Sequence, residues 1–118
     1  MNRDDLVALI AEVEAGTATG NAETTFVPTD TWNLIERVFG ADDIVWDAFV
    51  GAHDGYIDDA IILLRSLLPD STVWSIKARL AGARASAVVA GSSASAPTPA
   101  RALLLATLRA KLTEMDAA

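Results

Sequence analysis

The fold is decided by residues 56–113, which read YIDDAIILLRSLLPDSTVWSIKARLAGARASAVVAGSSASAPTPARALLLATLRAKLT. Apolar residues at first recur every three to four positions, and this pattern stops at Pro69. From Trp74 onward apolar and polar residues alternate, and the helical period returns after Pro99. Because helices and strands place their side chains with different periods, the stretch predicts a helix, a β-hairpin and a second helix.

The first of these helices is apolar over most of its circumference, which is typical of a buried helix. Pro69 ends it, because proline cannot continue a helix. Its apolar residues are Ile57, Ala60, Ile61, Leu63, Leu64, Leu67 and Leu68.

The hairpin is predicted over residues 73–90, with its turn around Gly82. In the first strand one face carries Trp74, Ile76, Ala78 and Leu80, and the other carries Ser75, Lys77 and Arg79. We expect Trp74 to belong to the core. The second strand, residues 84–90, has small side chains that leave room for a helix to lie close.

The segment GSSASAP after the hairpin reads as a flexible connector. Thr98 and Pro99 then predict a helix start, since proline is tolerated at the first helical position. The expected buried stripe of this last helix consists of Leu104, Leu105, Leu108, Leu112 and Met115.

The N-terminal half is less regular. The apolar spacing predicts a helix over residues 3–15, followed by a loop whose letters TTFV could add an edge strand. A second helix starts at Thr29 or Asp30 and ends at Gly40. The pattern of residues 41–55 fits either a short helix or a pair of strands, and we expect a strand or extended segment.

These elements make an α+β fold, with about four helices packed on a small antiparallel sheet that contains the 73–90 hairpin. The chain of 118 residues is 52% hydrophobic and 21% charged, which indicates one globular domain over residues 1–118. It has no cysteine, so disulfides, thiol catalysis and cysteine-bound metals are excluded.

Charge is distributed unevenly along the chain. Residues 1–70 hold 14 carboxylates against three arginines, a balance of −11, whereas residues 71–118 hold two carboxylates against six basic residues, a balance of +4. This layout can steer a charged partner or favour head-to-tail self-association, although a mixed solvated surface is the commoner explanation. The net charge of −7 disfavours duplex DNA as a partner.

No membrane span or secretory signal is expected. The longest uninterrupted apolar run has five residues, against roughly 20 in a spanning helix, and the N-terminus MNRDD is acidic. We therefore expect a soluble protein of the cytoplasm.

Six aspartates and the only histidine lie within 18 positions: Asp42, Asp43, Asp47, His53, Asp54, Asp58 and Asp59. Carboxylate oxygens are the ligands that Mg²⁺ and Ca²⁺ prefer, and His53 beside Asp54 could act as an oriented base. Helix capping and the helix dipole explain the same residues without chemistry. We predict no catalytic residues, no metal and no cofactor, and keep a small metal-dependent enzyme as an alternative.

The same region carries aromatic residues in an acidic setting, which is typical of a protein-binding surface. The competing interpretation is that these rings close the core. The residues predicted to bind a protein partner are Trp46, Asp47, Phe49, His53, Asp54 and Tyr56.

The C-terminal half resembles small proteins of unassigned role in tailed bacteriophages and prophages, some of which are similar to the phage ABA sandwich domain. They share a leucine- and alanine-rich helix that ends at a proline, a W-S-I/V strand and a T-P-A-x-A-L helix. Tyr56 departs from the pattern, which usually has a serine there, and WDAFVGAHDGY replaces an aromatic-rich region. The matching residues are Asp58, Ala60, Leu64, Pro69, Trp74, Ser75, Ile76, Thr98, Pro99, Ala100, Ala102 and Leu103.

This resemblance implies a fold and a phage origin, but no activity, since the family has no established function. Together with the acidic aromatic region, it leads us to expect a non-enzymatic phage or prophage accessory protein that binds another protein, for example in a host or anti-phage system. A structural or assembly component of the virion is the alternative.

Overall fold

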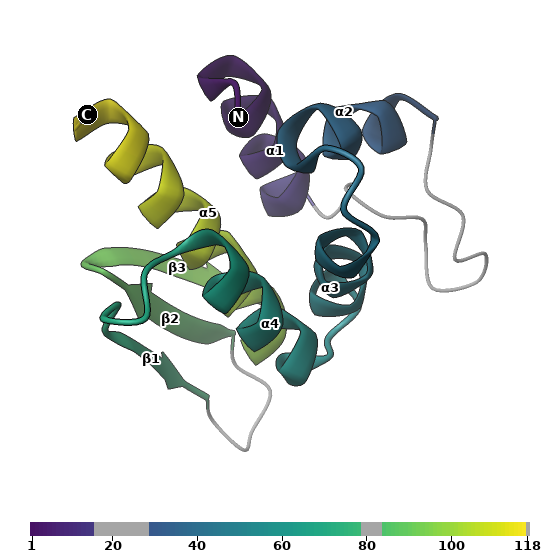
Figure 1. The fold of residues 1–118 in the computed structure, drawn as a ribbon. Helices are drawn as coiled ribbons and strands as arrows, with labels where there is room; N and C mark the ends of the chain where they lie inside the picture. Colours follow the sequence, from purple (N-terminus) through teal and green to yellow (C-terminus); the bar gives the residue numbers. More distant parts are fainter. Residues whose placement is uncertain (16–28, 79–83, 118) are drawn as a thin grey trace.

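The computed structural model describes residues 1–15, 29–78 and 84–117. Five helices and three strands follow one another along these residues (Figure 1). Their order is α1 (Arg3–Ala15), α2 (Thr29–Phe39), α3 (Asp43–His53), α4 (Ile57–Leu67), β1 (Trp74–Lys77), β2 (Ala85–Val89), β3 (Ser92–Ala96) and α5 (Pro99–Ala117). The predicted α+β class and the hairpin are confirmed.

Helix α5 forms the centre of the molecule. It packs against all three strands on one side and against α1, α3 and α4 on the others (Figure 1). Thr98 begins it as predicted, since its hydroxyl oxygen accepts from the backbone N–H of Arg101 at 3.1 Å. The buried surface is wider than the predicted stripe and includes Ala100, Ala102, Leu103, Leu104, Leu105, Ala106, Thr107, Leu108 and Ala110.

The sheet is antiparallel with strand order β1-β2-β3. Alternation along β2 and β3 turns the alanines and Val89 toward α5 and turns Val88 toward the outside, so Ala94 and Ala96 are buried while Ser93 and Ser95 are exposed. Because these inward side chains are small, α5 lies close to the sheet.

Strand β1 is covered less well than predicted. Trp74 faces the same side as buried Val89, its partner in the register, but 38% of it is exposed. The strand ends at Lys77, whereas residues 79–83, with the predicted turn around Gly82, lie outside the described residues. The expectation that Trp74 belongs to the core is therefore wrong.

The expected strand at residues 41–55 is wrong, because α3 is a helix. Asp42 caps its N-terminus by accepting from the backbone N–H of Ile44 at 3.0 Å and of Val45 at 3.3 Å. Burial follows the helical period, and the buried residues of α3 are Val45, Ala48, Phe49, Ala52 and His53. This element raises the number of helices to five.

The flexible connector expected after residue 90 is also wrong, since Ser92–Ala96 is strand β3. Ala90 and Gly91 form a two-residue hairpin turn, with φ values of 48° and 87°. Positive φ at both turn positions matches the right-handed twist of the flanking strands. The serine and alanine alternation supplies the strand pattern without β-branched residues.

The remaining predictions differ in outcome. Helices α1 and α2 form as predicted, and Gly40 ends α2 with φ of 72°. Helix α4 also forms, but its outer face is open, because Ile57 and Ile62 are exposed. The predicted edge strand TTFV lies outside the described residues. Among the described helices, none has the length and apolar character needed to cross a membrane.

Ala90 carries a backbone strain that can be relieved. A left-handed conformation costs a residue with a Cβ about 1–2 kcal/mol, and asparagine tolerates it best after glycine. We expect Ala90→Asn to raise the free energy of unfolding by about 0.5–1 kcal/mol in urea titrations. The control Ala90→Val should lower it, and equal effects of both changes would contradict the turn assignment.

Candidate protein-binding site

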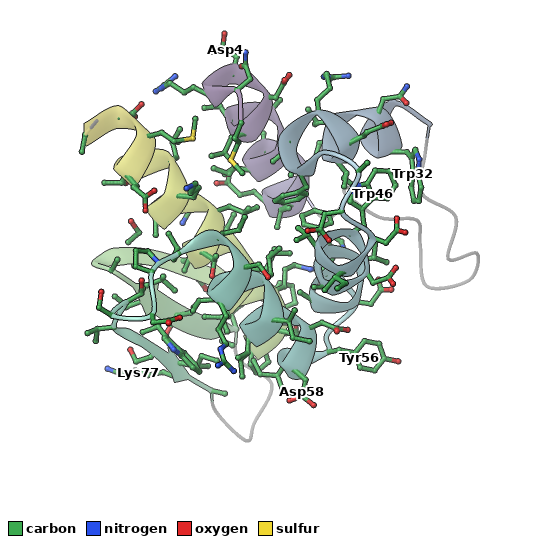
Figure 2. The ribbon with its side chains drawn as sticks, viewed as in Figure 1. Asp4, Trp32, Trp46, Tyr56, Asp58 and Lys77 are labelled. Atoms are coloured by element: carbon green, nitrogen blue, oxygen red, sulfur yellow. The ribbon has the colours of Figure 1, made fainter. Side chains whose placement is uncertain are left out.

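A hollow of about 360 Å³ opens between α2, α3 and the start of α4. It is lined by Trp32, Trp46, Asp47, Val50, Gly51, Tyr56 and Asp59. We call this hollow the aromatic pocket. Figure 2 shows Trp32, Trp46 and Tyr56 on the side of the molecule that carries α2 and α3, away from the sheet.

Two tryptophans form one wall of the aromatic pocket. The ring centroids of Trp32 and Trp46 are 4.1 Å apart, and the rings are nearly perpendicular at 85°. The indole N–H of Trp46 donates to the carbonyl oxygen of Gly40 at 2.8 Å, which holds that ring in place. Trp32 remains 43% exposed, so this edge-to-face pair is partly open to water.

Tyr56 forms the opposite wall at the N-cap of α4. Its side chain makes no capping hydrogen bond and is 66% exposed. Its backbone N–H donates to the carbonyl oxygen of Gly51 at 2.9 Å, which fixes the turn between α3 and α4. An aromatic residue thus takes a position where serine, threonine or aspartate would stabilise the helix better.

The floor of the aromatic pocket depends on the absence of a side chain at Gly51. A Cβ built there would overlap the carboxylate of Asp59 and lie 3.0 Å from its Cβ. The side chain of Asp59 therefore lies directly on the backbone of α3. This contact lets α3 and α4 approach closely and places a half-buried carboxylate beside the rings.

The structure brings together three of the six predicted binding residues: Trp46, Asp47 and Tyr56. Phe49 and His53 are corrections, because both face the core and are 0% and 1% exposed. Asp54 is exposed as the C-cap of α3, and it does not line the pocket.

Sequence reasoning missed four residues of the aromatic pocket: Trp32, Val50, Gly51 and Asp59. The helical spacing of Trp32 and Ile35 predicts that both lie on the apolar face of their helix, although Trp32 is 43% exposed and lies at the rim. For Gly51 a signal was available, since a glycine inside a helix often marks a close approach of another segment. Val50 and Asp59 can be placed at the pocket only once residues 41–55 are known to form a helix.

His53 is a buried residue of the core. Burial, and to a lesser extent the positive charge of Arg101, lower its pKa to about 4. The guanidinium of Arg101 donates to the carbonyl oxygen of His53 from Nε at 3.2 Å and from Nη2 at 3.0 Å. These bonds join the end of α3 to α5, which is a structural role.

The aspartates of residues 42–59 are spread over separate positions. Asp42 caps α3, Asp43 lies in its first turn, Asp54 is its C-cap, and Asp58 and Asp59 lie in the first turn of α4. In residues 1–15, 29–78 and 84–117, no group of three or more histidines or carboxylates is placed to hold a metal ion.

A second hollow of about 330 Å³ lies where the end of α4 meets β1. Its lining mixes apolar side chains with Arg65 and Asp70, which carry opposite charges. It exists because α5 reaches β2 and β3 more fully than β1. The aromatic pocket is the stronger candidate, since its rings are exposed and its charges have one sign.

The close contact at Gly51 can be tested by a double-mutant cycle. Gly51→Ala gains about 1 kcal/mol of helix propensity, but the overlap with Asp59 costs about 1–3 kcal/mol. We expect a net loss of stability in urea unfolding. In an Asp59→Ala background the same change should be neutral or stabilising, and an unchanged effect would contradict the contact.

Burial of His53 predicts a pH-dependent stability. The imidazole takes up a proton near pH 6.5 in the unfolded chain but only near pH 4 in the folded chain. Between these values the unfolded state binds more protons, so stability falls as pH falls, by at most about 1.4 kcal/mol per pH unit. Above pH 6.5 this contribution is constant.

We expect His53→Gln to lower stability at pH 7 but to flatten the pH dependence between pH 6.5 and 4. Urea unfolding of both proteins across this range measures the difference, and the carboxylates common to both cancel. Parallel profiles would show that the imidazole is not the group responsible.

Comparison with protein-family models, with curated proteins and with solved structures finds no match for this chain. The resemblance to small phage proteins therefore stays a prediction based on the residues quoted above.

Proposed function

We propose that this protein is a small, non-enzymatic phage or prophage accessory protein that binds another protein through the aromatic pocket. The observation that supports the binding role is the group of three rings at the pocket, of which Trp32 and Tyr56 are exposed and Trp46 is half-buried. The phage origin is supported only by the sequence resemblance of the C-terminal half.

The rings support a binding role because large aromatic side chains contribute most of the energy in many protein interfaces. Trp46 is fixed by its hydrogen bond to Gly40, so little conformational freedom remains to be lost on binding. Tyr56 and Trp32 present apolar surface that the fold leaves open to water. A partner that covers these two rings would remove their apolar surface from water, which stabilises the complex.

The charge around the aromatic pocket supports the same proposal. Residues 38–64 contain six aspartates and no lysine or arginine. A surface of one sign steers an oppositely charged partner and speeds its association. Modulation of a host or anti-phage protein would use such a surface.

The test uses Tyr56→Ser, a change that removes a pocket ring and installs a good N-cap for α4. Tagged wild type and variant are used for affinity capture from host lysate, with and without phage, and the captured proteins are identified by mass spectrometry. Since hot-spot rings contribute about 2 kcal/mol or more, we expect at least about a tenfold loss of the captured partner.

Val88→Thr is the matched control, because Val88 is exposed on the outer face of the sheet and threonine suits a strand. It should capture the partner as wild type does. Equal loss in both variants, or no loss with Tyr56→Ser, would contradict binding through the aromatic pocket. Recovery of virion proteins would favour the assembly role.

A further inference from the structure

The aromatic pocket combines three rings with two carboxylates, Asp47 from α3 and Asp59 from α4. We propose that it holds a cationic side chain, an arginine within a basic segment of the partner protein. This inference rests on the proposed function and names the chemistry of the partner.

The rings provide the first attraction. The face of an aromatic ring carries negative charge density and attracts a cation within about 6 Å of its centroid, most strongly when the ring is tryptophan. Trp32 and Trp46 stand nearly perpendicular, and Tyr56 lines the same hollow. Its volume of about 360 Å³ is at the lower end for ligand pockets, which suits one side chain rather than a large molecule.

The carboxylates provide the second attraction. Asp59 is half-buried and held against Gly51, so its charge is placed before any partner arrives. Among the residues that the structure describes, the side-chain carboxylates of Asp47 and Asp59 take part in no ion pair or hydrogen bond. A cation in the aromatic pocket would supply the partner that both carboxylates lack.

Two carboxylates elsewhere in the fold, unlike those of the aromatic pocket, form ion pairs. On α1, Asp5 pairs with Arg37 at 3.2 Å and Glu14 pairs with Arg109 at 2.6 Å. The fold thus provides an arginine for each of these two acidic residues of α1. The carboxylates of the aromatic pocket remain available to a partner.

Arginine fits this arrangement better than lysine. Its planar guanidinium can stack on a ring and donate to a carboxylate with two parallel N–H groups, whereas the lysine ammonium is a strongly hydrated point charge. The negative surface also extends beyond the pocket, because Asp43 and Asp58 are exposed nearby on the same two helices. One small free cation would leave this surface uncovered, which favours a segment with several positive charges.

The experiment titrates ¹⁵N-labelled protein with an acetylated Gly-Arg-Gly amide peptide, with a Gly-citrulline-Gly peptide of the same shape but no charge, and with a Gly-Lys-Gly peptide. The chain has three tryptophans, so its indole N–H signals report on separate places. We expect the arginine peptide to shift the Trp32 and Trp46 signals saturably and to leave Trp74 unchanged. Citrulline should give no saturable shift, and lysine a weaker one.

Two variants of equal charge isolate the carboxylates. Asp47→Asn with Asp59→Asn should weaken binding of the arginine peptide at least about tenfold, since it removes both anionic acceptors. Asp4→Asn with Asp70→Asn loses the same two charges away from the aromatic pocket and should bind as wild type does. Equal loss in both double variants, or equal binding of citrulline, would overturn the proposal.

The outcomes separate this inference from the proposed function. A partner captured in a Tyr56-dependent way, without any shift by the arginine peptide, would overturn the inference and leave the function standing. Arginine binding combined with Tyr56-independent capture would contradict the function and support the cation preference. Self-association in sedimentation that is lost in Asp47→Asn with Asp59→Asn would place the cation on a second copy and overturn the assignment to a partner.

Discussion

Between Ala100 and Ala110, helix α5 is surrounded by the sheet on one side and by α1, α3 and α4 on the others. Fully burying one leucine contributes about 1.5–3 kcal/mol, and three consecutive turns of this helix contribute leucines or alanines to a single core. The one buried hydroxyl there, on Thr107, donates to the carbonyl oxygen of Leu103 at 2.8 Å. Helices α1, α3 and α4 and all three strands pack directly against this helix, and α2 is held through α1 and α3.

The aromatic pocket is a consequence of that packing. Helices α3 and α4 both rest on α5 and pack against each other, and where they meet Gly51 lets the side chain of Asp59 lie on the backbone of α3. The apolar residues of α3 are used on its inner face, so Trp46 and Asp47 are turned toward α2 and solvent. The surface rings are therefore held by a rigid base, which is what an interface anchor requires.

The sequence predicts the helices and strands in which apolar residues recur with one clear period. Strong apolar stripes and proline boundaries make α4, α5 and the first hairpin readable, because burial and propensity agree there. For α3 the sequence pattern favours a strand, because β-branched residues and Gly51 lower the helix propensity. Packing of Phe49 against the core instead decides that this segment is a helix. Strand β3 was misread because serine and alanine carry little hydrophobic contrast. The acidic aromatic composition is enough to predict Trp46, Asp47 and Tyr56, three of the seven residues that line the aromatic pocket. Trp32 and Asp59 join them because of the way the helices cross, and the sequence pattern does not show that crossing.

The ion pairs Arg3 to Asp116 and Glu14 to Arg109 join α1 to α5 across 113 and 95 positions of the chain. Such contacts form late, because a long loop must close before they contribute, whereas α4, the two hairpins and α5 are neighbours along the sequence. The topology thus separates two kinds of contact: those among α4, the strands and α5 join near neighbours in the sequence, whereas those of α1 with α5 join the two ends of the described chain. A local opening that breaks only the second kind would detach α1 and expose the side of α5 that it covers.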